Sequence, residues 1–374
     1  MLNLNLIYKF YYEWWKNIDK VIFLLIIFLF SLGLFFSLAS TSLIASGQLE
    51  TNSYFFFFKH LAYVFLAIII LIFFSSLSEK NLFKLSIFLF FTSLFFLILV
   101  PIIGTEVNEA KRWLDLIFLP RFQPIELVKP FTIIFLASIL SSEKNIHIYY
   151  KYSLSFFAIV PTSFLLMMQP DIGQTLLIFL SWITLVFISG ISLMIFLAFF
   201  SITLTSLIYL VFYIPKFGYI KNRIFSFFNP DTGTHGAQAA KSIDAISSGG
   251  FFGKGIGEGT LKYKGSEVHT DFIISVISEE FGVVIIILIL IIFLFFIYSV
   301  FKKVSLEENE KIKLVLVGSI TLIVAQALIH VGVNIRLFPT TGMTLPFLSY
   351  GGSSIIGVSI LTGIILNLTK RKVS

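Results

Sequence analysis

Long apolar segments recur along the chain and are separated by short polar connections. A transmembrane helix needs about 20 apolar residues to cross the hydrocarbon core of a bilayer. Segments of this kind predict ten transmembrane helices, near residues 21–43, 60–77, 82–103, 123–141, 152–169, 172–190, 191–214, 272–300, 312–334 and 345–367. The pattern therefore predicts an all-α polytopic membrane protein, with a long polar loop over 216–270 between the seventh and eighth helices.

The basic residues give this predicted array an orientation. Ten spans place both termini on one side, and short cytoplasmic loops carry an excess of Lys and Arg. The basic residues of the short loops and tails fall on one predicted face: Lys9, Lys16, Lys20, Lys80, Lys84, Lys144, Lys151, Lys302, Lys303, Lys311, Lys313, Lys370, Arg371 and Lys372. We therefore expect a single membrane domain over 1–374, with a cytoplasmic N-terminal segment (1–20), a cytoplasmic tail (368–374) and an extracytoplasmic 216–270 loop.

Composition agrees with a membrane protein. The 374 residues are 57% hydrophobic and 13% charged, and the mean hydropathy is +0.97. Soluble domains have about half apolar and about a quarter charged residues. The chain has no cysteine, which excludes disulfides and thiolate metal sites.

The most informative polar residues stand where the long loop meets the predicted eighth helix. Asp271 and His269 lie at the mouth of that helix, and Glu279 and Glu280 follow about two turns further on. Ionisable residues at membrane depth are costly, so they mark a functional site by default. The sequence therefore predicts that the chemistry of the protein is carried out around Asp271.

Other polar residues are predicted to reach the same outer end of the bundle. Glu126 and Lys129 have the i, i+3 spacing that lets two side chains pair on one helix face. The others are Glu106, Asn108, Lys111, Arg112, Asp115, Gln123, Gln169, Asp171, His330, Asn334 and Arg336. A transporter needs polar groups near the membrane midplane, whereas an enzyme acting on a lipid-linked polar substrate needs them at one interface. The asymmetry favours an enzyme.

Some of these features have plainer interpretations. Asp271 could be a helix N-cap, because Thr-Asp before an apolar run is a helix start signal. Lys111 and Arg112 could be interfacial anchors. The glycine-rich string Gly249–Gly259 lacks the Gly-Lys-Ser/Thr ending of a P-loop. It predicts instead a flexible backbone that can approach a substrate closely.

Six segments, in this order and together, resemble the SEDS family (shape, elongation, division and sporulation), which includes FtsW and RodA. They are Glu106–Trp113, Gln123–Lys129, Gln169–Gly173, Ser248–Gly255, His269–Gly282 and Pro339–Ser353. Each is weak alone, but six in register are specific. Further segments are similar to FtsW, the division member, of some alphaproteobacteria: Trp14–Asp19, Phe36–Ser42 and Gly257–Lys262.

The resemblance implies a ten-helix peptidoglycan glycosyltransferase that polymerises lipid II into glycan strands during cell division. It implies a place in the bacterial cytoplasmic (inner) membrane, at the division septum, with the active site facing the periplasm. The implied partners are lipid II (an undecaprenyl-pyrophosphate-linked disaccharide peptide), a class B penicillin-binding transpeptidase, other division proteins and membrane lipids, but no nucleic acid. The alternatives are a RodA-like elongation polymerase, a lipid II flippase and a non-catalytic scaffold of the division machinery.

The resemblance also assigns roles to residues. The family's essential carboxylate falls on Asp271, which would act as the general base of an inverting transfer. Basic candidates for stabilising the leaving pyrophosphate are Lys111, Arg112, Lys129, Lys241, Lys254, Lys262 and Arg336. Supporting candidates are Glu126, Asp171, His269, Glu279, Glu280, Asn334, Ser349 and Ser353. These residues require no cofactor and leave a divalent cation, Mg²⁺ or Mn²⁺, open.

Overall fold

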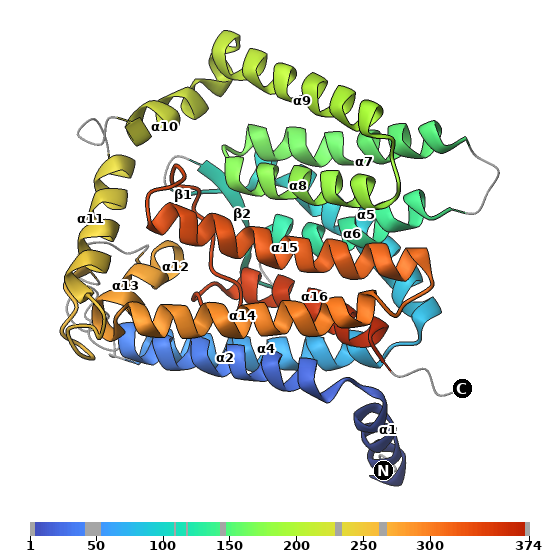
Figure 1. Cartoon of the computed structure of the whole chain (residues 1–374), viewed down its shortest axis with the longest axis horizontal. Helices are drawn as coiled ribbons and strands as arrows, with labels where there is room; N and C mark the ends of the chain where they lie inside the picture. Colours follow the sequence, from blue (N-terminus) through green and yellow to red (C-terminus); the bar gives the residue numbers. More distant parts are fainter. Residues whose placement is uncertain are drawn as a thin grey trace.

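The computed structural model describes residues 4–41, 54–107, 110–116, 119–142, 147–228, 234–261 and 268–370. It is mostly helical (Figure 1). The helices before residue 215 and after residue 282 are α1 (Leu4–Asn17), α2 (Lys20–Thr41), α4 (Phe55–Ser76), α5 (Glu79–Ile103), α6 (Pro124–Leu140), α7 (Ile148–Met168), α8 (Ile172–Ile188), α9 (Leu193–Tyr213), α14 (Val283–Val304), α15 (Glu310–Asn334) and α16 (Gly352–Leu368). Those between residues 215 and 282 are η1 (Pro215–Phe217), α10 (Gly218–Phe228), α11 (Thr234–Gly249), α12 (Val268–Asp271) and α13 (Ile273–Phe281).

The apolar segments fold as helices because a bilayer offers no hydrogen-bond partners to the backbone, so each segment must satisfy its own polar groups. Among the described residues, seven helices are long and apolar enough to cross a membrane: α2, α4, α5, α7, α9, α14 and α15. Helices α6, α8 and α16 have 17 residues each. The chain is therefore a multi-pass membrane protein, and each predicted span contains a helix.

Two of the predicted spans are wrong in detail. The span predicted at 272–300 is two helices, α13 and α14, because the chain breaks at Gly282, whose φ of +84° is a conformation that favours glycine. The span predicted at 345–367 begins only at Gly352, after a segment without helix. Both departures lie next to the candidate site.

The prediction of an all-α fold is also incomplete. The connection between α5 and α6 forms a three-stranded antiparallel sheet in the order β1 (Thr105–Val107), β2 (Ala110–Leu116) and β3 (Leu119–Phe122). Its alternation of side chains is partial, with Ala110 and Leu114 buried and Lys111 and Asp115 exposed. The sheet therefore covers the end of the bundle and presents charged side chains outward.

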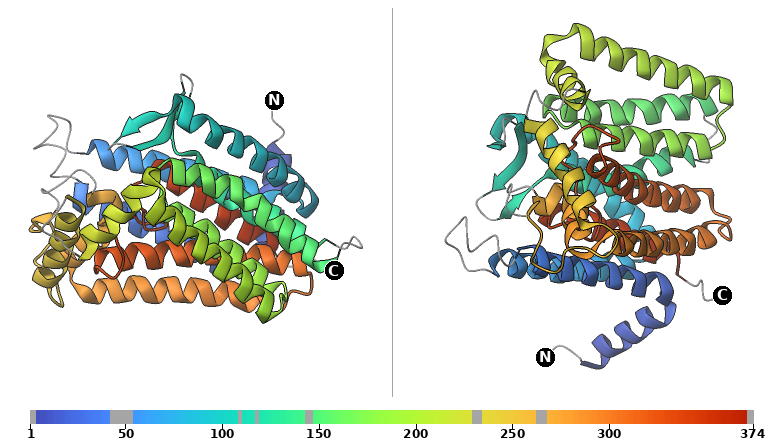
Figure 2. Two further views of the ribbon diagram at one scale, coloured as in Figure 1. Left: turned by 90° about the horizontal axis from the view of Figure 1, so that it is seen from above. Right: turned by 60° about the vertical axis from the view of Figure 1, so that its left-hand side comes forward.

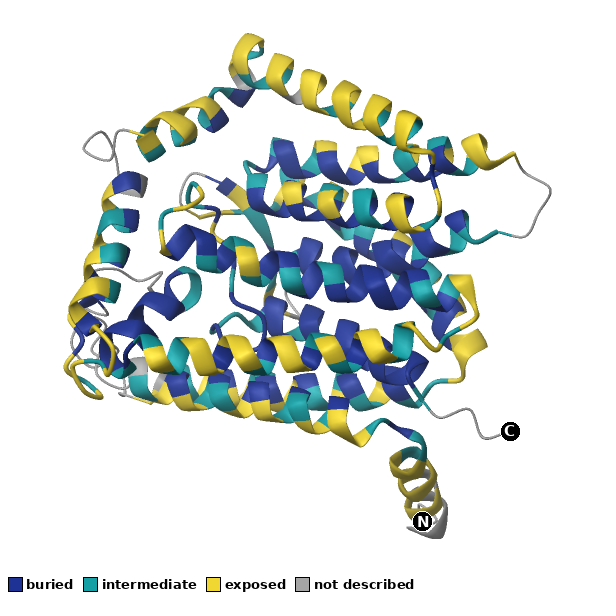
Figure 3. Cartoon of the chain, viewed as in Figure 1, coloured by how far each residue is buried: buried dark blue, intermediate teal, exposed yellow. Residues whose placement is uncertain are grey.

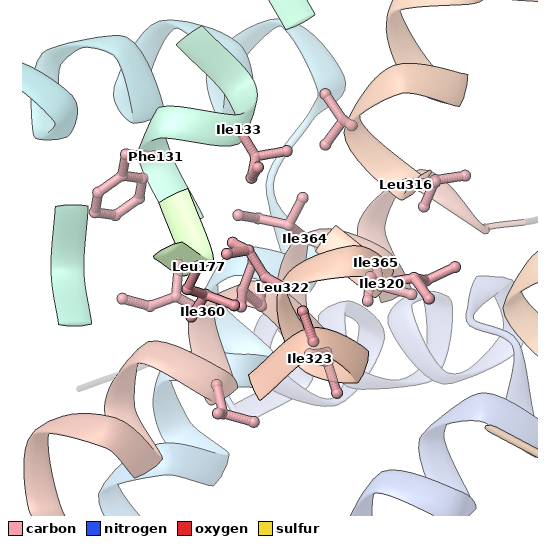
Figure 4. Close-up of a cluster of buried hydrophobic side chains, with 14 of the residues drawn as sticks. Phe131, Ile133, Leu177, Leu316, Ile320, Leu322, Ile323, Ile360, Ile364 and Ile365 are labelled. Carbon is pink, nitrogen blue, oxygen red and sulfur yellow. The ribbon is translucent and has the colours of Figure 1, made fainter. Parts of the chain in front are cut away.

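Helices α6, α8, α15 and α16 contribute a central part of the core, which side chains of α2, α4, α5, α7 and α14 extend. Figure 4 shows their side chains meeting: Phe131, Ile133, Leu177, Leu316, Ile320, Leu322, Ile323, Ile360, Ile364 and Ile365. Helices α15 and α16 are largely buried, whereas α9 is exposed along most of its length (Figure 3). The inner helices carry the buried charged pair Glu126 and Lys129, whereas α9 has no charged residue.

The predicted 216–270 loop is not irregular where the structure describes it. It carries α10, α11 and the start of α12, and α11 packs on α13. Figures 1 and 2 show α10 and α11 arching from α9 to the end of the bundle where α12, α13 and the strands lie. We call this end the site end. The N-terminal helix α1 and the end of α16 lie toward the opposite end (Figure 1).

One ion pair and two hydrogen bonds join neighbouring segments at that opposite end. Lys303 Nζ lies 2.8 Å from Asp19 Oδ2, and Trp14 Nε1 donates to Ser75 Oγ at 2.9 Å. Lys370 follows α16, and its Nζ donates to the Leu77 carbonyl at 3.4 Å. Two of the basic residues predicted to share one face, Lys303 and Lys370, thus lie at this end.

Candidate functional site

Asp271 is the last residue of α12, and a break at Phe272 separates it from α13. The N-cap of α13 is Phe272, so the interpretation of Asp271 as the N-cap of the following helix is wrong. Asn334, at the end of α15, donates from Nδ2 to the Asp271 carbonyl at 3.0 Å and accepts from Ser275 Oγ at 2.7 Å. Asn334 is fully buried, so this side chain fixes the backbone on both sides of the break.

A second buried side chain holds the residue before Asp271. Ser349 Oγ donates to the Thr270 carbonyl at 2.7 Å and accepts from the Leu345 amide at 2.8 Å. Ser349 lies in the non-helical segment before α16. The supporting roles predicted for Asn334 and Ser349 remain predictions about function, but both residues contact the backbone that carries Asp271.

Gly342 lies between Arg112 and Asp271. A Cβ atom on Gly342 would be 3.6 Å from Asp271 Oδ2 and 3.7 Å from Arg112 Nη1, which is van der Waals contact with both. The backbone of Gly342 therefore stands close to both charged groups, and no side chain of residue 342 fills the gap between them. Arg112 Nε donates to the Gln169 carbonyl at 3.1 Å, and Nη2 donates to the Pro170 carbonyl. These bonds join β2 to the turn between α7 and α8.

Arg223 is a site residue that the sequence reasoning missed. It lies on α10, and its Nη1 donates to the Thr340 carbonyl at 3.4 Å. Burial and the positive charge of Arg112 lower the pKa of Arg223, while Asp171 and Asp271 act in the opposite direction. The sequence did carry a signal, since a basic residue among aromatic ones in a predicted loop suggests more than a solvated connection.

Arg336 joins Arg223 around one small pocket. Its Nη2 donates to the Phe227 carbonyl at 3.2 Å, and both guanidiniums line the pocket with Phe227, Pro339 and Thr340. Arg336 has a φ of +56°, which non-glycine residues seldom adopt. The site end therefore brings Arg112, Arg223 and Arg336 around the segment 339–342, next to Asp271.

Lys129 is buried inside the bundle, where a pyrophosphate could not reach it. The pairing predicted from its spacing is present, with Lys129 Nζ 2.8 Å from Glu126 Oε2. Lys129 also donates to Gln326 Oε1 at 3.0 Å, and Gln174 donates to Glu126 Oε1 at 2.9 Å. The Lys129 side chain is only 3% exposed, so its charge is used inside the bundle.

Asp171, a predicted supporting residue, bonds to α8 and to Gln123. It caps α8 by accepting from the Gln174 amide at 3.3 Å, and it accepts from Gln123 Nε2 at 3.1 Å. The backbone N–H of Gln123 in turn donates to Ser353 Oγ at 3.0 Å. Asp171 and Ser353 thus join the beginnings of α6, α8 and α16.

Glu279 and Glu280 are buried in α13 and face the glycine-rich segment. Glu279 Oε1 accepts from Lys254 Nζ at 2.9 Å and from the Thr260 amide at 3.0 Å, and its Oε2 accepts from the Leu261 amide at 2.9 Å. The glycine-rich segment is thus hydrogen-bonded to α13, and its close approach to a substrate stays a prediction. Lys254 is likewise held by Glu279.

The remaining candidates are more scattered. Lys111 and Lys241 are exposed, on β2 and α11. Lys262 lies outside the described residues, and His269 belongs to α12 with a side chain that also lies outside them.

The fold is that of a multi-pass membrane protein. At one end of its helical bundle, buried side chains hold the backbone of Asp271, and three arginines that could bind an anion lie around the neighbouring segment 339–342. The comparison with protein families is specific. A model described as cell cycle protein, covering FtsW, RodA and SpoVE, matches residues 19–373. The chain therefore belongs to this family.

Two relatives are similar over nearly the whole chain, and both are described as probable peptidoglycan glycosyltransferase FtsW. The protein of Caulobacter vibrioides is 28% identical over 96% of this chain and 91% of its own length. The protein of Buchnera aphidicola from Acyrthosiphon pisum is 32% identical over 94% of this chain and 88% of its own.

Solved structures show the same fold. A chain from "Structural coordination of polymerization and crosslinking by a peptidoglycan synthase complex" superposes with a TM-score of 0.75 at 24% identity, covering 94% of this chain and 97% of that one. The rod shape determining protein RodA of Thermus thermophilus gives 0.69 at 24% identity, covering 94% and 96%.

Proposed function

We propose that this protein is a peptidoglycan glycosyltransferase that polymerises lipid II during cell division. The observation that carries the proposal is the open gap between Asp271 and Arg112 at the site end, in a chain whose family match spans 19–373. The FtsW descriptions of its relatives support the division role. RodA-like elongation is the alternative within the family.

We propose that the chain crosses the membrane ten times. Helices α2, α4 to α9, α14 to α16 supply the crossings, with α13 entering ahead of α14. The site end then faces the periplasm, and the opposite end, where α1 and the end of α16 lie, faces the cytoplasm together with both termini (Figure 1). The inner membrane of a bacterium, at the division septum, is the location that fits this reaction.

In the proposed reaction, Asp271 is the general base. It takes the proton from the acceptor sugar hydroxyl as that oxygen attacks the anomeric carbon of the donor, and the bond to the lipid pyrophosphate breaks with inversion. The buried contacts of Asn334 and Ser349 fix the backbone of 270–271 so that the carboxylate stays aimed at the gap. The substrate hydroxyl would occupy the space that the missing side chain of Gly342 leaves.

Arginines would stabilise the pyrophosphate as its charge develops. Arg112, Arg223 and Arg336 lie around the segment 339–342, and guanidinium groups bind phosphate oxygens in a bidentate manner. Lys111 and Lys241 remain candidates for the rim, since both are exposed. A divalent cation, Mg²⁺ or Mn²⁺, would arrive with the pyrophosphate, whose oxygens are its natural ligands.

A flippase is less well supported than a polymerase. Flipping a polar headgroup requires polar side chains near the membrane midplane. Glu126 and Lys129 lie in the first two turns of α6 and neutralise each other. The polar side chains of the site end serve a reaction at one interface instead.

The proposal also names a protein partner. A class B penicillin-binding transpeptidase would crosslink the new strand, as expected from the fold shared with the peptidoglycan synthase complex. Other division proteins would recruit both. Depletion of this protein in its host should then give filaments blocked at septation, whereas round cells that still divide would favour elongation.

The direct test is lipid II polymerisation by purified protein, with and without the transpeptidase. Asp271→Asn keeps the size of the side chain and removes its basicity, so polymerisation should fall by about 10²–10⁴-fold. Asp244→Asn is the matched control, because Asp244 is an exposed carboxylate on α11. If Asp271→Asn polymerises lipid II like the control, Asp271 is not the base.

A further inference from the structure

The glycine-rich segment is built onto the junction between α13 and α14. Its backbone runs beside that junction and is joined to it by four hydrogen bonds. They are Lys254 N to Glu279 O (2.9 Å), Gly255 N to Glu280 O (3.1 Å), Val283 N to Gly250 O (3.0 Å) and Val284 N to Phe251 O (3.3 Å). The segment therefore has one defined position at the start of α14.

Glycines make this close approach feasible. A side chain at Gly253 would collide with the backbone of Glu280, and one at Gly282 would collide with the backbone of Phe251. Both glycines also have positive φ, +80° and +84°. The buried Glu279 carboxylate adds the bonds to Lys254 and Thr260. Several independent features thus fix this segment in place.

What the fixed segment presents outward is apolar. Phe251 is 76% exposed, Phe252 is 85% exposed and Ile256 is 65% exposed. We call Phe251 and Phe252, together with the neighbouring aliphatic Ile256, the aromatic tip. Apolar side chains held this far out by a rigid backbone would be unfavourable in water, so the position of the tip requires an apolar surrounding.

The surface that continues from the tip faces lipid. Val284 bonds to the Phe251 carbonyl and opens the apolar helix α14, whose Ile287 and Leu288 are exposed on the outside of the bundle. Phe35 of α2 is half-exposed and contacts Phe281, at the end of α13, with ring centroids 5.7 Å apart. The tip is therefore level with the first turn of a membrane-spanning helix and continuous with its lipid-facing side.

We propose that the aromatic tip inserts into the interfacial layer of the lipid leaflet at the site end. Amphipathic and aromatic side chains are enriched at this depth of a bilayer. Lys254, next to the tip, is partly exposed, but its charge is paired with Glu279, so the apolar side chains of the tip carry the insertion. The tip thereby anchors α13, which begins two residues after Asp271, at a fixed depth relative to the lipid that carries a substrate.

The absence of cysteine in the chain allows a direct test. A nitroxide spin label is attached to Phe252→Cys in the full-length protein in liposomes of phosphatidylethanolamine and phosphatidylglycerol. Its collisions with lipid-soluble oxygen and with a water-soluble nickel chelate are then measured. Leu288→Cys on α14 is the lipid-facing reference, and Ser247→Cys on α11 is the water-facing reference, because both positions are exposed.

The label at 252 should resemble the label at 288, with oxygen collisions exceeding chelate collisions several-fold, and should differ from the label at 247. A label at 252 that the chelate reaches as readily as at 247 overturns the proposal. So does a label shielded from both reagents, which would show that protein covers the tip. Phe251→Cys repeats the measurement if Phe252→Cys does not fold.

Discussion

Asn334→Ala should lower polymerisation far more than it lowers stability. The Asn334 side chain is fully buried and bonds to the Asp271 carbonyl and to Ser275. Its removal leaves the Asp271 carbonyl without this donor. Ser275 keeps other partners, because its amide also donates to Phe272 and its hydroxyl bonds to Ser242.

The two effects differ in size. One buried carbonyl that loses its donor costs about 1–3 kcal/mol, and side-chain hydrogen bonds within membrane bundles average about 0.6 kcal/mol. The protein should therefore still fold. A displacement of about 1 Å in a reacting group, however, costs about 10²-fold in rate. With the α12–α13 break released, we expect kcat to fall about 10²-fold and KM to change only a few-fold.

The assay is the initial rate of lipid II polymerisation at several substrate concentrations, together with the melting temperature in detergent. Ser359→Ala is the matched control, because Ser359 is fully buried and its hydroxyl donates only within α16, to the Ile356 carbonyl at 2.7 Å. Equal kcat for the two variants would refute the positioning role of Asn334. A large loss of melting temperature in Asn334→Ala alone would show that its role is structural.

Three further outcomes are expected. Arg223→Ala should reduce polymerisation by about 10²-fold, because the leaving group loses stabilisation. Lys221→Ala, a change at an exposed residue of the same helix, should leave the rate unchanged. Similar rates for the two variants would show that Arg223 has no role in the site. Reporter fusions at Ser247 and Glu308 should lie on opposite sides of the membrane, and agreement between them would contradict the ten-crossing arrangement. Glu279→Ala should speed limited proteolysis within 250–261, because the segment loses its carboxylate anchor; unchanged cleavage would mean that the backbone bonds suffice.

The apolar pattern predicted where most helices lie, because spanning a bilayer imposes both length and composition. It missed the sheet over Thr105–Phe122, whose short strands carry charged residues and give no long periodic signal. It also ran the eighth span through Gly282, since one glycine in an apolar run does not by itself mark a break. The sequence pattern predicts the backbone least well where a neighbouring segment determines its conformation.

The sequence by itself determined that this is a membrane protein with ionisable residues gathered at one end, and it singled out Asp271 and Arg112. Only the tertiary structure decided which charges face each other. It brought Gln326 of α15 to Lys129, and it placed Arg223 of α10 within electrostatic reach of Asp271. The reason is physical: hydrophobicity is a property of each segment, whereas electrostatic contact depends on distances between segments that packing alone sets.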